Sequence, residues 1–135
     1  MHNIFSIYYT VTETSNFFET TQIINNDPFI SNIYASNYIF NNNQIIGTAL
    51  TRATCQQVGD KIFNIIISLI YFIKDKGNIV TEYSYISHIP SSIFPPNFEA
   101  KFQIINGTEA FLNKKGVAYL KVIVDNVRQV DFYFE

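Results

Sequence analysis

Apolar and polar residues alternate along much of this chain with the period of two that is typical of β-strands. The clearest stretch is Asp60–His88, in which two runs rich in Ile, Val, Tyr, Phe and Thr are separated by a charged cluster with a glycine at Lys74–Asn78. Such residues favour a pleated, half-buried backbone, and the cluster is typical of a turn. The stretch therefore predicts a long β-hairpin.

The first half of this hairpin, Ile62–Ile73, is apolar on both faces. It is too short to span a bilayer, and Asn64 and Ser68 interrupt it. An antiparallel strand with one face in water would carry polar residues on that face. We therefore expect one face to lie in the core and the other to be covered by another part of the chain or by another subunit.

Alternation and turn residues predict six more strands besides the two of the hairpin. They lie at His2–Thr12, Phe29–Phe40, Gln44–Gln57, Phe98–Asn106, Lys115–Val124 and Val127–Phe134. Polar Glu13–Asp27 is expected to be a short irregular connection with a possible helical turn around Asn16–Thr21. Three of the four prolines fall in the segment 89–97 and predict a loop there, because proline cannot donate to a sheet ladder.

About eight antiparallel strands predict an all-β, closed antiparallel barrel, with residues 1–135 as a single domain. A barrel of this size holds side chains or one small ligand in its interior. On the predicted strand Gln44–Gln57 the odd positions from Ile45 to Cys55 are mostly small, which suits the crowded inside of a closed sheet.

Composition excludes several classes of protein. The chain has 47% hydrophobic and 15% charged residues with a net charge of -2, so it is expected to fold, and it lacks the basic patch that nucleic acid requires. One cysteine and two histidines predict neither a metal site nor a disulfide, and no cofactor is expected. No signal peptide or membrane span is recognisable, which indicates a cytoplasmic protein.

The segments IIGTALTRATC, YFIKDKGNIVTEYSYIS, IINGTEAFLNKKGVAYLKV and VDFYFE resemble the allene oxide cyclase and dirigent β-barrels. Those families carry a Gly-Gly-x-Gly-x-Phe turn followed by a further glycine and an apolar strand. Here Asn106–Phe111 stand in that turn, with Glu109 at its last glycine and Gly116 at the later one. The resemblance is clearest over residues 44–134, and its motifs describe backbone and packing.

The resemblance implies a barrel with an apolar cavity, assembled as a trimer, which binds, cyclises or sterically guides a small apolar molecule. Any enzyme of this kind would be a cyclase or isomerase that acts by orientation. The first-strand glutamate and asparagine of the cyclases correspond here to Tyr9 and Val11. The cavity cysteine and tyrosine of the cyclases correspond to Cys55 and Tyr85.

Tyr9, Cys55 and Tyr85 are therefore the candidates for lining a ligand cavity, although such residues are more often ordinary core residues. Glu82 and Asp131 would be candidate bases if they face inward, and solvated surface residues otherwise. His88, at a strand end, is either a surface residue or an acid or base at the barrel rim. Arg52 is expected to pair across a subunit contact or with solvent.

Two classes of function remain open. One is a cavity protein, either an enzyme or a binder of a small apolar molecule. The other is a structural or interaction barrel whose interior is filled by Phe and Ile and whose apolar outer strand builds a homo-oligomer. An open apolar pocket with a few polar groups would favour the first, and a packed interior the second.

Overall fold

The computed structural model describes residues 2–11, 16–23, 29–88 and 97–135. Within these ranges the chain forms nine strands and two three-residue 3-10 helices. The elements are β1 (His2–Thr10), β2 (Asn16–Ile23), β3 (Phe29–Asn41), β4 (Gln44–Gly59), β5 (Ile62–Ile73), β6 (Gly77–Ser87), β7 (Glu99–Gly107), η1 (Glu109–Phe111), β8 (Gly116–Val122), η2 (Val124–Asn126) and β9 (Val127–Phe134). The prediction of an all-β chain is confirmed.

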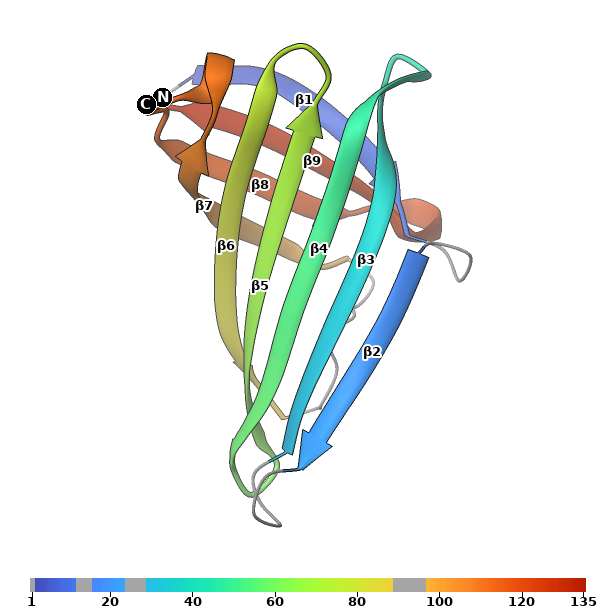
Figure 1. The fold of residues 1–135 in the computed structure, drawn as a ribbon, viewed down its shortest axis with the longest axis vertical. Helices are drawn as coiled ribbons and strands as arrows, with labels where there is room; N and C mark the ends of the chain where they lie inside the picture. The colour runs from blue at the N-terminus through green and yellow to red at the C-terminus, as the bar shows by residue number, and fades with distance from the viewer. Residues whose placement is uncertain (1, 12–15, 24–28, 89–96) are drawn as a thin grey trace.

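The strands form one antiparallel sheet that closes into a barrel, as predicted. Their order is β1-β9-β8-β7-β6-β5-β4-β3, and β1 contacts β3 to complete the circuit of eight strands. Long strands β3 to β6 make one side, and β7, β8, β9 and β1 cross behind them at a steep angle (Figure 1). Hairpin β5–β6 is the one predicted from Asp60–His88, with Phe63 paired to Ser87 and Ile73 paired to Gly77.

Strand β1 closes the barrel by contacting two neighbours. It pairs with β9 from His2 to Thr10, but with β3 only at Tyr8 and Phe40. Asparagine side chains strengthen this narrow contact: Asn37 Nδ2 donates to the carbonyl of Thr10 at 2.9 Å, and Asn41 Nδ2 donates to the carbonyl of Ser6 at 3.0 Å. Side-chain amides thus replace part of the ladder that backbone groups would otherwise provide.

The prediction that Glu13–Asp27 is an irregular connection with a helical turn was wrong over its middle. Residues Asn16–Ile23 form strand β2, which pairs with the first half of β3 from Phe29 to Ser36. Strand β3 is longer than its contact with β1, so its free backbone edge accepts a second partner. The β-branched pair Thr20–Thr21, which disfavours a helix, fits a strand. The rest of the expected connection, and the proline-rich segment 89–96, lie outside the described residues.

Alternating side chains of each strand fill the barrel. On β5 the residues Phe63, Ile65, Ile67, Leu69, Tyr71 and Ile73 are all buried, while Ile62, Ile66 and Phe72 on the other face are more than a third exposed. One face of this strand thus lies in the core, as predicted, and it is the face of the odd-numbered residues. The small odd residues of β4 also point inward, since Ala49, Ala53 and Cys55 are almost fully buried.

A bulge interrupts that pattern at the start of β4. Ile39 pairs with Gly47 and Phe40 with Ile45, so Ile46 is inserted without a partner of its own. The inserted residue reverses the faces. Ile45, which the alternation placed inside, is therefore 55% exposed, and Ile46 packs against the core.

The turns use residues that tolerate left-handed backbone geometry. Asn42 and Asn43 have φ of 50° and 63°, as the asparagine run predicted. Glu109, which stands at the last glycine of the family turn, also has a positive φ of 52°. The backbone at Glu109 thus adopts a left-handed conformation in which glycine is favoured, although this chain has glutamate there.

We expect Gly116→Ala to lower the free energy of unfolding by about 2–4 kcal/mol in urea denaturation, because of strain and steric overlap. Gly116 has a φ of +148°, and a Cβ there would lie 2.0 Å from the carbonyl oxygen of Tyr133. Gly59→Ala is the matched control, since its Cβ would meet only the flexible Ile62 side chain, at 3.3 Å. The control should change stability by less than about 1 kcal/mol. Equal losses in the two variants would contradict this account.

Candidate functional site

Two of the three predicted cavity residues lie close together. Cys55 on β4 pairs with Ile65, which pairs in turn with Tyr85 on β6. All three side chains face the interior, Cys55 being buried and Tyr85 half-buried against the core. The Tyr85 hydroxyl has a raised pKa because of burial first, then the neighbouring Tyr83 and Cys55.

Tyr85 belongs to an aromatic group where β6 and β7 part. Tyr83 stacks on Phe102 with ring centres 5.2 Å apart, and Tyr85 and Phe98 lie beside them at 5.7 Å and 6.2 Å from Tyr83. The β6–β7 ladder ends at Glu82 and Gln103. A surface groove of about 410 Å³ lies there, lined by Glu82, Tyr83, Ser84, Lys101, Gln103 and Ile105. Tyr83 therefore separates this groove from the barrel interior.

The third predicted residue, Tyr9, belongs to a different interior site. It lies on β1 directly beside Arg128 of β9, and both side chains are buried, with 1% and 4% exposed. Arg128 Nη1 donates to the carbonyl of Asn126 at 2.6 Å. A cationic side chain thus lies inside the barrel wall next to a buried phenol.

Sequence reasoning missed Arg128, although a signal was present. On β9 the inward positions are Arg128, Val130, Phe132 and Phe134, so the arginine stands in register with apolar residues. A charged residue on an apolar face is an informative exception to the usual burial pattern.

Tyr71 and Thr81 extend the polar site. Tyr71 is fully buried, and its hydroxyl has no hydrogen-bond partner among the described residues. Thr81 lies near the Tyr71 hydroxyl and opposes the rise in its pKa. The Thr81 hydroxyl itself donates its hydrogen to the carbonyl of Leu69 at 2.9 Å. Asn37, Ala49 and Tyr71 occupy one cross-strand row, in which the small residue Ala49 stands between the two polar residues.

The site offers hydrogen-bond donors at neutral pH. Burial raises the pKa of the Tyr9 hydroxyl, with Arg128 opposing the rise, so this phenol stays protonated. Burial, then Tyr9, raises the pKa of Tyr71 in the same direction. Burial lowers the pKa of Arg128, with Tyr9 opposing, yet a guanidinium remains charged. We refer to Tyr9, Tyr71 and Arg128 as the donor cluster.

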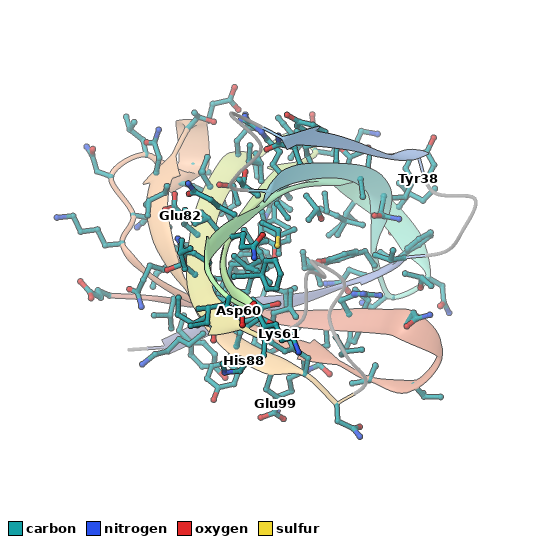
Figure 2. All side chains as sticks on the ribbon, turned by 90° about the horizontal axis from the view of Figure 1, so that it is seen from below. Tyr38, Asp60, Lys61, Glu82, His88 and Glu99 are labelled. Carbon is teal, nitrogen blue, oxygen red and sulfur yellow. The ribbon has the colours of Figure 1, made fainter. Side chains whose placement is uncertain are left out.

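The weaker candidates lie outside the interior. Glu82 and His88 are exposed (Figure 2), and His88 Nδ1 lies 3.2 Å from the carbonyl oxygen of Lys61. Asp131 is on the outward face of β9, where neighbouring strands cover it. Its carboxylate accepts hydrogen bonds from Ser6 Oγ at 2.5 Å and from Gln129 Nε2 at 3.2 Å.

Aromatic rings fill the end of the barrel that holds η1. Phe5 packs on Phe132 at 4.8 Å between ring centres, Phe111 stacks on Phe134 at 5.9 Å, and Tyr71 meets Phe132 edge-on at 5.1 Å. The donor cluster therefore lies next to a packed apolar end.

In the described ranges, no three His, Cys, Asp or Glu side chains form a group suited to a metal ion. None of the helices found there is long and apolar enough to cross a membrane.

No model of a known protein family matches the chain, and neither does any curated protein. Nineteen chains of solved structures match it in fold. One of them is pyocyanin demethylase, with a TM-score of 0.58 and 12% sequence identity over 97% of this chain and 98% of that one. At this identity the match shows a shared barrel fold and no more.

We expect the free energy of unfolding to fall as the pH rises above about 10, the ordinary pKa of tyrosine. The unfolded chain then loses protons that buried Tyr9 and Tyr71 retain, because their pKa values are raised in the folded state. The loss is about 1.4 kcal/mol per pH unit for each such group. Urea denaturation between about pH 8 and 11 should therefore show a shallower loss in Tyr9→Phe and in Tyr71→Phe.

Tyr38→Phe is the control, because Tyr38 is 62% exposed on the outer surface. The free energy of unfolding of this variant should change with pH as that of the wild type does. If the wild type and all three variants showed the same pH dependence, the pKa values of Tyr9 and Tyr71 would not be raised in the folded state.

Proposed function

We propose that the protein binds a small, largely apolar molecule inside the barrel, with an acceptor oxygen of that molecule held by the donor cluster. The observation that carries the proposal is the position of Arg128, buried on the inner face beside the protonated Tyr9. A guanidinium presents its N–H donors in a fixed planar arrangement. This arrangement suits an acceptor oxygen of a ligand carboxylate, phenolate or carbonyl.

Tyr71 supports the same conclusion. Its hydroxyl is an unsatisfied donor among the described residues, and buried polar groups of this kind usually have a partner. Small inner residues such as Ala49, Ala53 and Cys55 line the neighbouring wall. An apolar chamber with a few donors would fix the orientation of a ligand.

The enzymatic form of the proposal is a cyclase or isomerase that acts by holding one conformation of its substrate. The alternative is a non-enzymatic structural barrel. Its support is the packed aromatic end around Phe132 and the exposed apolar outer face of β5.

The test uses dansylaminoundecanoate, a fluorescent fatty acid, and its uncharged methyl ester as probes. We expect the wild type to bind the acid more tightly than the ester by about tenfold or more, because a hydrogen bond to a charged group contributes about 1.5–3 kcal/mol. Arg128→Met should abolish this preference and retain ester binding. The readout is dansyl fluorescence in equilibrium titrations.

Lys121→Met is the control, because it removes a positive charge from the outward face of β8. It should leave both affinities unchanged. If neither probe binds, or if Arg128→Met keeps the preference for the acid, the ligand-binding proposal fails and the structural alternative is favoured.

A further inference from the structure

The outer face of β4, β5 and β6 carries exposed apolar side chains. On β5 the outward residues Ile62, Ile66 and Phe72 are each more than a third exposed, and on β6 Ile86 is 59% exposed. The structure describes every residue of these three strands. Within the strands themselves, the only charged side chains are Arg52 and Glu82. Exposed apolar side chains grouped on a sheet are typical of an interaction site.

The outward residues on the two sides of β5 match one another in four consecutive rows. The pairing registers place Thr48 and Asn78 beside Phe72, Leu50 and Val80 beside Ile70, Arg52 and Glu82 beside Ser68, and Thr54 and Ser84 beside Ile66. In three of these rows the flanking residues are alike, polar with polar or apolar with apolar, and in the row of Ser68 they are charges of opposite sign. The next row differs, because polar Gln56 and apolar Ile86 lie beside Asn64.

This pattern is self-complementary about an axis along β5. A two-fold rotation about that axis exchanges β4 with β6, so each flanking residue of one copy faces the other flanking residue of its partner. We propose that this face binds a second copy of the chain about a two-fold axis along β5, with Arg52 of each copy paired to the partner's Glu82. Such an isologous contact forms both ion pairs at once.

The charges also select this axis over its alternative. A two-fold axis across the strands would keep β4 opposite β4, so that Arg52 would face the partner's Arg52 and Glu82 the partner's Glu82. Like charges placed opposite each other at an interface oppose association. The axis along β5 replaces both repulsions by attractions.

The side-chain sizes fit two convex surfaces that meet along β5. Sheets that pack face to face lie about 10 Å apart, and in a barrel the neighbouring strands curve away from the contact line. Ser68 at the centre of the charged row is small, whereas Arg52 and Glu82 beside it are long enough to bridge the wider gap. Glu82 projects from the outside of the barrel wall (Figure 2).

The experiment uses Arg52→Glu and Glu82→Arg, examined separately and mixed. Native mass spectrometry and analytical ultracentrifugation should show a wild-type dimer. Each single variant alone should dissociate with a Kd at least about tenfold higher, because each homodimer then holds only like-charged pairs. The mixture should form a one-to-one heterodimer, since every Glu then faces an Arg of the other chain.

Lys121→Glu on β8 is the control, because it makes the same change of charge as Arg52→Glu on a strand that β7 separates from the contact. It should leave the wild-type Kd unchanged, and circular dichroism should show the same fold in all variants. A monomeric wild type, the three-fold assembly that the family resemblance implies, or a mixture of single variants that fails to associate would overturn the proposal.

Discussion

The structure depends on one strand that has to satisfy two neighbours. Strand β1 pairs with β9 along its length and reaches β3 at a single register, where Asn37 and Asn41 add side-chain hydrogen bonds. Without that closure the sheet would have two free edges, and its interior side chains would face water. The donor cluster lies beside the same contact, because Tyr9 is carried by β1. The fold and the candidate site thus share one constraint.

Alternation of apolar and polar residues was enough to predict the barrel. It predicted that one face of β5 lies in the core, and it located the small residues of β4 on the inside. It failed at Ile45, because a single inserted residue reverses which side chains of the strand point inward. The local sequence does not reveal where such a bulge occurs. It also failed at β2, because the segment Asn16–Ile23 is strand only through pairing with a long neighbour.

The candidate site was harder to predict than the fold for a related reason. Family resemblance directed attention to Tyr9 and Cys55, but the residue that distinguishes the interior is Arg128, which no motif marks. Its position beside Tyr9 follows from the register that joins the first and last strands of the barrel. The pyocyanin demethylase structure shares the fold at 12% identity, so the chemistry of the interior has to be taken from this chain's own residues.

The pairing of β1 with β9 has a consequence for how the chain is made. Ser6 and Asp131, which share a hydrogen bond, are 125 positions apart. Hairpins such as β5–β6 bring together residues that are close in sequence and are free to form as they leave the ribosome. The pairing of β1 with β9 has to wait until nearly all of the 135 residues have been synthesised. Until then the apolar inner faces of β4 and β5 remain accessible to chaperones and to other nascent chains.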